Sequence, residues 1–145
     1  MVLFADTSAL IKLYLDEPHT NTMRQLARDS QVLCVCRLAW AEAFAALAQR
    51  VRLKSADIDA AELARRELAR HWVSFSVIDV TQPVVERAGD YADTFSLRAY
   101  DAVQLAAAQE LAVHLDDPPA FACFDRRLNR AAEILGMKVP FIESI

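Results

Sequence analysis

Two aspartates follow apolar runs of the kind that form buried strands. Asp6 comes directly after the run 2–5, and Asp125 comes directly after the run 120–124. The carboxyl ends of the strands line the ligand crevice of an open α/β sheet, so a carboxylate at either junction is well placed for chemistry. The alternative for each is a helix N-cap, because helical sequence follows both. Whether the two strands are neighbours cannot be read from their spacing.

Two further carboxylates lie in Ala-rich helical segments. Glu42 is the only charged residue of the segment 38–48, so we expect that helix to be largely buried and to carry Glu42 into a cation or hydrogen-bond site. The alternative is a narrow stripe facing solvent. Asp101 begins the second segment, where the helix dipole and capping alone favour an acidic residue. Taken singly, Asp101 does not indicate function.

A cation must accompany these four carboxylates if they converge. Two like charges about 5 Å apart repel by roughly 3 kcal/mol at an effective dielectric constant of about 20. Carboxylate oxygens select Mg²⁺, with Mn²⁺ as the other candidate. Zinc is disfavoured, because the 3 histidines are scattered and no Cys-x-x-Cys spacing occurs. The 2 glycines exclude a Gly-rich phosphate-binding loop, and no Gly-x-Ser-x-Gly elbow presents a nucleophilic serine.

Short β-rich runs alternate with longer amphipathic segments, which is typical of an α/β fold with a mostly parallel sheet. The length of 145 residues suits one domain, residues 1–145. We expect strands over 2–5, 32–36, 74–80, 120–124 and 139–142. We expect helices over 8–15, 20–27, 38–52, 56–72, 83–95, 102–115 and 126–135, with Gly136 as the C′ residue of the last.

Composition limits the class of protein. With 16 basic and 20 acidic side chains, the net charge of −4 argues against a generally basic nucleic-acid binder. No apolar run is long enough to span a bilayer, and Asp6 and Lys12 interrupt the only stretch that could serve as a signal peptide. The odd number of cysteines, with Cys34 and Cys36 in an apolar run, indicates reduced core thiols. We therefore expect a cytoplasmic protein with no membrane partner.

Four segments together resemble the PIN-domain ribonucleases, and among them the VapC-type toxins of bacterial and archaeal toxin–antitoxin pairs. They are Asp-Thr-Ser-Ala-Leu at 6–10, the lone Glu42 in its apolar helix, Arg-Ala-Tyr-Asp-Ala-Val-Gln-Leu-Ala at 98–106, and Phe-Asp-Arg-Arg-Leu at 124–128 with a following Ala-Ala and Leu-Gly. Each motif is weak alone, but their order within this length is fairly specific. The resemblance extends from residue 2 to about residue 142.

The resemblance implies a parallel sheet of order 3-2-1-4-5, Mg²⁺-dependent endonucleolytic cleavage of RNA, a homodimer, and inhibition by a co-encoded antitoxin protein. It also implies an acidic metal site formed by Asp6, Glu42, Asp101 and Asp125. Two positions depart from the family pattern: Cys123 stands where many relatives have Thr or Ser, and Gln104 stands where His is common. Loss of the hydroxyl at Cys123 could weaken a contact to a water or to a ligand carboxylate.

We therefore expect metal-assisted phosphodiester hydrolysis that leaves a 5′-phosphate and a 3′-hydroxyl. In this hypothesis Asp6 and Asp125 are the central ligands, Asp101 is a further ligand, and Glu42 binds the metal or orients the water. Several nearby residues have both a functional and an ordinary interpretation. Ser8 contributes a hydroxyl or caps a helix, and the arginines contact substrate phosphates or form a solvated helix face; they are Arg98, Arg126, Arg127 and Arg130.

Two other classes of protein stay open. A catalytically silent PIN-like module would act by binding alone, and Cys123 is the only residue that favours it. A phosphoacceptor receiver domain needs an aspartate at the end of its third strand and a lysine after its fifth. Asp79 fits the first requirement, but Lys138 precedes the last expected strand. The charge balance is compatible with a metal-dependent nuclease, because removing the 4 acids of the site from the 20 leaves 16 acidic and 16 basic residues, so the net charge equals that of the empty site.

Overall fold

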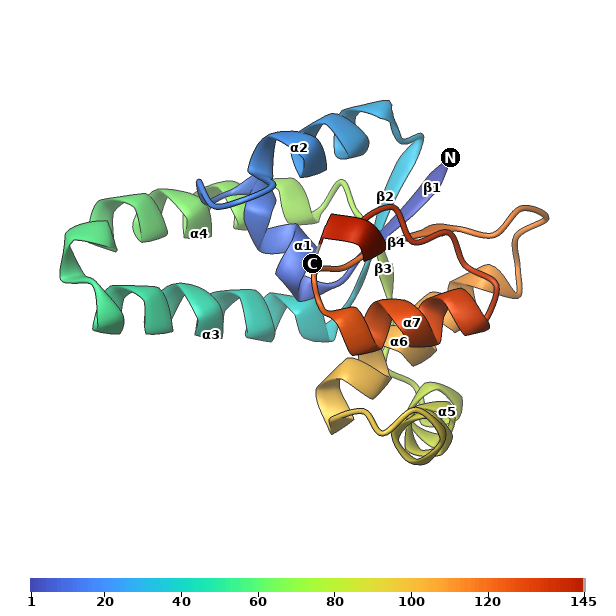
Figure 1. The fold of residues 1–145 in the computed structure, drawn as a ribbon. Helices are drawn as coiled ribbons and strands as arrows, with labels where there is room; N and C mark the ends of the chain where they lie inside the picture. Colours follow the sequence, from blue (N-terminus) through green and yellow to red (C-terminus); the bar gives the residue numbers. More distant parts are fainter. Residues whose placement is uncertain (145) are drawn as a thin grey trace.

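A parallel four-stranded sheet of order β3-β2-β1-β4 forms the centre of the computed structural model, which describes residues 1–144 (Figure 1). The strands are β1 (Val2–Ala5), β2 (Val32–Cys36), β3 (Ser76–Ile78) and β4 (Ala120–Ala122). β1 is central and pairs in parallel with both β2 and β4. The α/β class is confirmed.

Helices connect the strands and cover both faces of the sheet (Figure 1). They are α1 (Thr7–Leu10), α2 (Thr20–Asp29), α3 (Leu38–Leu53), α4 (Ile58–Trp72), α5 (Gln82–Thr94), α6 (Ala99–Ala112) and α7 (Arg126–Ile134). Three short 3₁₀ turns add η1 (Ile11–Leu13), η2 (Ser55–Asp57) and η3 (Ile142–Ser144). Gly136 follows α7 with φ of 91°, in the left-handed conformation that a C′ glycine adopts without strain, as expected.

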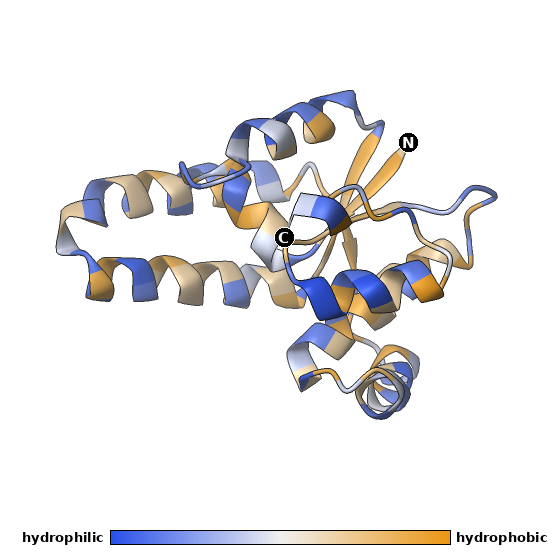
Figure 2. Cartoon of the chain, viewed as in Figure 1, coloured by the Kyte–Doolittle hydropathy of each residue, from blue (hydrophilic) through white to orange (hydrophobic). Residues whose placement is uncertain are grey.

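Successive residues of the strands face opposite sides of the sheet, so each face has its own core. Leu3 packs into a cluster with residues of α1 to α4, whereas Phe4 packs with residues of α6 and α7. The β1 and β4 side chains are buried from Leu3 to Ala5 and from Ala120 to Ala122. Both faces are therefore covered, which explains why the strands are continuous apolar runs in Figure 2.

The expected fifth strand over 139–142 does not form. Lys138 makes a single parallel bridge with Ala120, in which its N–H donates to the carbonyl of Pro119 and its carbonyl accepts from the N–H of Phe121. Because bonding groups on a strand face the same neighbour at every second residue, the next donor would be the N–H of residue 140. That residue is Pro140, which has none, so the pairing ends and the chain turns into η3.

The expectation that the helix containing Glu42 is largely buried is also wrong. The α3 positions with buried side chains are Ala39, Ala43 and Leu47, and Trp40 is 37% exposed. α3 and α4 form a long hairpin that projects from the body of the protein (Figure 1). α3 is apolar because it is rich in alanine, and not because it is buried on all sides. Only the face that packs against α4 and the body of the protein is covered.

Smaller differences concern the ends of elements. β3 and β4 are shorter than the expected 74–80 and 120–124, and the α1 segment changes to a 3₁₀ turn at Ile11. All three cysteines are buried and free of disulfides, as expected. Within residues 1–144 no helix is both long and apolar enough to cross a membrane.

Candidate active site

The carboxyl ends of β1 and β4 lie side by side and bring Asp6 and Asp125 to the same edge of the sheet. β1 pairs with β4 in register from Leu3 with Ala120 to Ala5 with Ala122. The N–H of Asp6 continues the ladder by donating to the carbonyl of Ala122 at 3.1 Å. The adjacency of these two strands, which the spacing could not establish, is therefore present in the fold.

Asp6 is the most deeply buried of the four carboxylates, with 5% of its surface exposed. One oxygen, Oδ1, accepts from Ser8 Oγ at 2.6 Å and from the N–H of Ala9 at 3.3 Å, so Asp6 is also the N-cap of α1. Burial is the main cause that raises its pKa from the usual 3.8 to about 6, and the charge of Asp101 raises it further. The cap and the site are thus the same residue.

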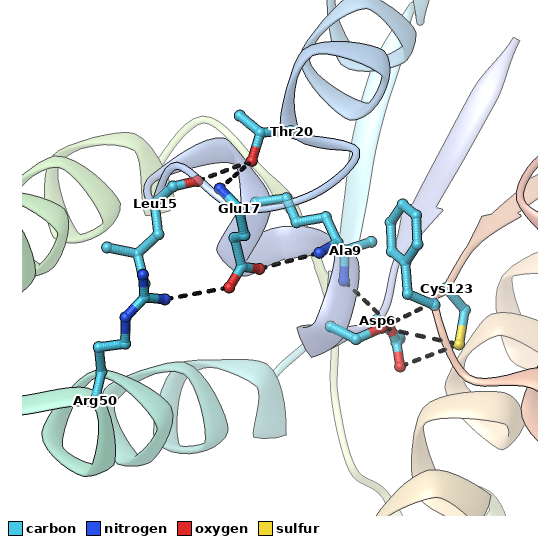
Figure 3. A network of polar contacts seen from close by, with 10 residues as sticks. Asp6, Ala9, Leu15, Glu17, Thr20, Arg50 and Cys123 are labelled. Atoms are coloured by element: carbon cyan, nitrogen blue, oxygen red, sulfur yellow. Dashed lines mark hydrogen bonds and ion pairs between the residues drawn. The ribbon is translucent and has the colours of Figure 1, made fainter. Parts of the chain in front are cut away.

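Cys123 directly follows β4 and contacts Asp6, at the position where the family resemblance led us to expect a hydroxyl. Its thiol donates to Asp6 Oδ2 over 3.5 Å (Figure 3). It also accepts from the N–H of Asp125 at 3.2 Å. Burial raises the pKa of this thiol far above its usual range, and the charge of Asp6 adds to the effect, so it stays protonated. The sulfur therefore makes the contact to the carboxylate that a hydroxyl would make, at greater length.

Ser8 joins the two strand ends and is not a simple cap. Its hydroxyl donates to Asp6 Oδ1, and it accepts from the N–H of Phe124 at 2.9 Å. The first contact stays within the start of α1, whereas the second crosses from α1 to the segment after β4. Ser8 therefore fixes the Asp6 carboxylate relative to the chain that carries Asp125.

Glu42 is held by a closed triangle of hydrogen bonds. Its Oε1 accepts from Thr7 Oγ1 at 2.9 Å and from Gln104 Nε2 at 2.7 Å. Gln104 Nε2 also donates to Thr7 Oγ1 at 3.1 Å, so the triangle connects α1, α3 and α6. The amide orientation is fixed, because the reverse orientation would place Gln104 Oε1 against a carboxylate. We call these three residues the Glu42 clamp.

The sequence analysis missed the two neutral members of the Glu42 clamp as functional residues. In the sequence, Thr7 stands out only as part of the motif at 6–10, and Gln104 only as a departure from the family pattern. Gln104 is 1% exposed, and its Oε1 has no partner among the described residues. An amide in the middle of an Ala-rich, buried helix was the available signal, because such a side chain needs a partner.

Asp101 links the remaining carboxylates electrostatically. It lies in the first turn of α6 and is partly buried. Burial raises its pKa first, and the charges of Asp125 and Glu42 raise it further, whereas Arg98 opposes them. Asp101 also contributes to the raised pKa of Asp6. Asp101 is therefore close enough to each of the other three carboxylates for their charges to interact.

A cleft of about 410 Å³ opens beside this cluster. Asp101 and Asp125 lie in its wall, and three arginines line it as well: Arg98, Arg126 and Arg127. Asp125 is exposed and caps α7 by accepting from the N–H of Leu128 at 2.8 Å. Arg127 donates to the carbonyl of Ser96 across the cleft at 2.9 Å. Arg130 is exposed on α7 and is not among the residues that line the cleft.

The donor set suits a hard divalent cation. Across residues 1–144 no three acidic, histidine or cysteine side chains are already arranged around one metal position. Burial raises the pKa of Asp6 and of Asp101, and repulsion from neighbouring carboxylates adds to it, so a bound cation would stabilise their ionised forms. Mg²⁺ keeps several of its waters and takes only one or two carboxylates directly, so it does not require a preformed cage. Oxygen donors with unbalanced charge fit that ion.

The receiver-domain alternative does not agree with the fold. It needs its third strand beside the acidic edge, but β3 is the outer strand, separated from β1 by β2. Asp79 follows β3 and forms an exposed ion pair with Arg37. Lys138 bridges to the first residue of β4, at the opposite end of that strand from Asp125. Neither residue can act at the Asp6 cluster.

Comparison with known proteins identifies relatives along nearly the whole chain. The family model described as "PIN domain" matches residues 3–134. Ribonuclease VapC46 of Mycobacterium tuberculosis is 32% identical over 137 residues, which cover 94% of this chain and 95% of the relative. Ribonuclease VapC45 of the same species is 34% identical over 140 residues, with coverage of 95% and 94%.

Solved structures share the fold at lower identity. A Mycobacterium tuberculosis VapC20 structure, described as a sarcin-ricin loop cleaving toxin, has a TM-score of 0.67 and 20% identity over 90% of this chain and 95% of that one. A toxin–antitoxin complex from Klebsiella pneumoniae has a TM-score of 0.61 and 16% identity, with coverage of 85% and 86%. At these identities the likeness shows the fold alone.

Proposed function

The chain belongs to the PIN domain family, and from this premise we propose that it is an endoribonuclease, dependent on Mg²⁺ or Mn²⁺, that acts as the toxin of a toxin–antitoxin pair. The relatives named VapC ribonucleases match it at 32–34% identity over almost their full lengths. The single observation that supports the catalytic part is the charge interaction of Asp101 with Asp6, Glu42 and Asp125, together with the burial that raises the pKa of Asp6 to about 6.

Asp6, Asp101 and Asp125 would hold the ion, because Asp6 and Asp125 follow the neighbouring strands β1 and β4 and Asp101 lies in the first turn of α6. When bound, Mg²⁺ supplies positive charge at the scissile phosphate and makes a water molecule more acidic. Ser8 and Ala9 hold Oδ1 of Asp6, so this carboxylate keeps one orientation. The Glu42 clamp engages Oε1 of Glu42 and leaves its second oxygen outside the clamp, where it is available to orient a water.

Substrate binding would use the cleft beside the carboxylates. The arginines Arg98, Arg126 and Arg127 line it together with Asp101 and Asp125. Cations next to the acidic cluster bind phosphates without requiring a basic protein overall, which reconciles a nucleic-acid substrate with the net charge of −4. Guanidinium groups match phosphate oxygens in a bidentate geometry.

The cleavage assay uses purified protein freed of any antitoxin, structured RNAs and Mg²⁺. The variants Asp6→Asn and Asp101→Asn remove a charge from the site, and Asp117→Asn removes one from an exposed loop before β4, at the opposite end of that strand. We expect wild type and Asp117→Asn to cleave RNA, and both site variants and chelator-treated wild type to be inactive. Equal cleavage by all proteins would mean a contaminating nuclease and would refute the proposal.

The partners expected from the resemblance belong to the same proposal. We propose a co-encoded antitoxin that inhibits the enzyme, which agrees with the fold shared with a toxin–antitoxin complex. We further propose a homodimer, and a cytoplasmic location for a protein whose substrate is RNA. Light scattering of the purified chain should give twice the mass of 16.2 kDa, and co-expression with the neighbouring reading frame should yield a complex that no longer cleaves RNA.

The catalytically silent module gains no support from its one motivating residue. Cys123 donates to Asp6 Oδ2 and accepts from the N–H of Asp125, which are the contacts that a hydroxyl at this position would make. The four acidic side chains stay in place around it. Hydrolysis is therefore the function that the geometry supports better.

A further inference from the structure

A column of three stacked rings leads from the core to the surface beside the carboxylates. Phe141 is 2% exposed and stacks on Phe124, with ring centroids 4.4 Å apart and planes inclined by 26°. Phe124 in turn stacks on His19, at 5.4 Å and 21°. The imidazole of His19 is exposed. The column therefore ends in an aromatic ring at the surface, anchored from below by two phenylalanines.

The backbone holds the imidazole in this place at a conformational cost. His19 has φ of 70° and ψ of 5°, a left-handed conformation that non-glycine residues rarely adopt. It is the N-cap residue of α2, yet its side chain makes no capping hydrogen bond. The preceding loop is fixed instead by Thr20 Oγ1, which donates to the carbonyl of Leu15 and accepts from the N–H of Glu17 (Figure 3). The left-handed backbone conformation of His19 therefore places its imidazole ring against the ring of Phe124.

Polar contacts fix Phe124 in turn and join it to the carboxylates. Lys12 Nζ lies 4.6 Å from the centroid of the Phe124 ring and pairs with Glu17 at 3.1 Å. The N–H of Phe124 donates to Ser8 Oγ, which donates to Asp6. Phe124 also directly precedes Asp125 in the chain. Hence two hydrogen bonds connect the ring column to Asp6, which follows β1, and one peptide link connects it to Asp125, which follows β4.

The ring column and the arginine-lined cleft are joined through Asp125. Asp125, Arg126 and Arg127 line the cleft. Phe124, which precedes Asp125 in the chain, stacks on His19. An RNA strand with one phosphate at the carboxylates would have the arginine side chains of the cleft available for its neighbouring phosphates. The same strand would also reach the exposed ring of His19 at the end of the ring column. Aromatic rings that end in solvent next to a phosphate-binding cleft are the features that bind unpaired bases.

We propose that His19 is a stacking platform for one unpaired nucleobase of the RNA, next to the phosphate that is cleaved. This inference rests on the proposed ribonuclease function and specifies its substrate as RNA that is single-stranded at that nucleotide, because a base inside a duplex has both faces covered by its neighbours. The base adds a fourth ring to the column. His19 contacts substrate but takes no part in the chemical step.

Two substitutions separate the ring of His19 from its backbone. His19→Asn removes the ring and keeps a residue that tolerates the left-handed conformation, whereas His19→Tyr keeps an aromatic ring. With a single-stranded RNA that the wild type cleaves, we expect His19→Asn to raise KM roughly tenfold, as for loss of one base–aromatic stack, with kcat little changed. His19→Tyr should restore KM. Urea unfolding of each variant checks that the fold is retained.

A scan of the substrate tests the same contact in the unaltered protein. A series of RNAs, each lacking one base, should contain one position beside the cleaved phosphate where the wild-type KM rises roughly tenfold. In His19→Asn that position should become silent. A wild-type KM in folded His19→Asn overturns the inference; if that variant does not fold, the absence of a sensitive position in the scan overturns it.

Failure of the proposed function is distinguishable from failure of the platform. If the wild type cleaves no RNA, the ribonuclease proposal fails directly. If it cleaves RNA but the scan and His19→Asn show no change in KM, only the platform fails. Binding of a fluorescein-labelled oligouridylate of about 12 nucleotides to Asp101→Asn, with and without His19→Asn, measures the stacking contact apart from cleavage.

Discussion

Replacing Asp6 by asparagine should stabilise the ion-free protein at neutral and alkaline pH while it destroys the site. Asp6 is the most deeply buried carboxylate of the site, and burial raises its pKa from 3.8 to about 6. The ionised Asp6 carboxylate therefore destabilises the folded protein, and a rise in pKa of this size corresponds to about 3 kcal/mol. Asparagine has no charge to bury, and it caps a helix about as well as aspartate, so the contacts to Ser8 and Ala9 can persist.

The sign follows from proton binding. Between about pH 4 and pH 6 the folded protein keeps the proton on Asp6 and the unfolded chain has lost it, so the free energy of unfolding falls as the pH rises. Above about pH 7 both states are ionised and the whole penalty is present. Below about pH 4 both are protonated and the penalty is absent. The difference between variant and wild type should therefore grow from near zero at pH 4 to its maximum at pH 8.

Urea unfolding of the metal-free proteins measures this difference directly. We expect Asp6→Asn to be more stable than wild type at pH 8 by about 3 kcal/mol, equivalent to a rise in Tm of roughly 10 °C, and to lose the advantage towards pH 4. Asp117→Asn is the matched control and should stay within about 0.5 kcal/mol of wild type at both pH values. Added Mg²⁺ should stabilise wild type but not Asp6→Asn.

A variant that is no more stable than wild type at pH 8 would refute the reasoning, because the buried charge would then cost nothing. A stability gain that is the same at pH 4 and pH 8 would refute it as well, since the benefit would come from some cause other than ionisation of Asp6.

Further predictions concern the contacts around the site and the core beneath it. Gln104→Leu removes a donor from Glu42, so cleavage activity should fall and the free energy of unfolding should drop by about 1–3 kcal/mol, measured by RNA cleavage and urea unfolding; unchanged activity would contradict a positioning role. Cys123→Ser replaces a thiol by a stronger hydrogen-bond donor and should lower the pKa of Asp6, so the fall in the free energy of unfolding that accompanies ionisation of Asp6 should end at a lower pH; an unchanged pH range would count against the contact. Leu105→Ala opens a cavity in the fully buried core on the α6 side and should cost about 2–5 kcal/mol in the same unfolding assay, and a loss below 1 kcal/mol would show that this core collapses around it.

The positions of the carboxylates could be predicted because each depends on local sequence. Asp6 and Asp125 end apolar strands, and Asp101 begins a helix, so their places in the elements follow from the pattern of neighbours alone. The adjacency of β1 and β4 is different, since it came only from the family resemblance. No local feature of the sequence distinguishes the strand order β3-β2-β1-β4 from other orders of parallel strands.

The partners of Glu42 could not be predicted from the pattern of its own helix. Its hydrogen bonds come from Thr7 and Gln104, which are 35 and 62 residues away in the chain. These contacts depend on how α1 and α6 approach α3, and that approach is set by the packing of the sheet. Glu42 was expected to need a partner because its helix was thought buried, yet α3 projects with α4 and only its base meets the site (Figure 1).

The absent fifth strand has a local cause that propensity alone does not weigh correctly. Val139 and Ile142 favour a strand, but Pro140 removes the donor that the second bridge to β4 would need. A proline in a short β-rich run thus decided its structure. The same segment supplies Phe141, the buried ring at the base of the ring column.

The most direct test of the central claim is the Mg²⁺ dependence of the rate at which wild type and Asp101→Asn cleave one labelled RNA. The charge of Asp101 interacts with those of the other three carboxylates, and the substitution removes this charge while keeping the size of the side chain. The account predicts a wild-type rate that rises with Mg²⁺ and saturates, products with a 5′-phosphate, and a rate at least about 100-fold lower for Asp101→Asn, since even residues that only support metal ligands change activity by about 10- to 100-fold. Equal rates for the two proteins, or cleavage that persists without a divalent ion, would contradict it.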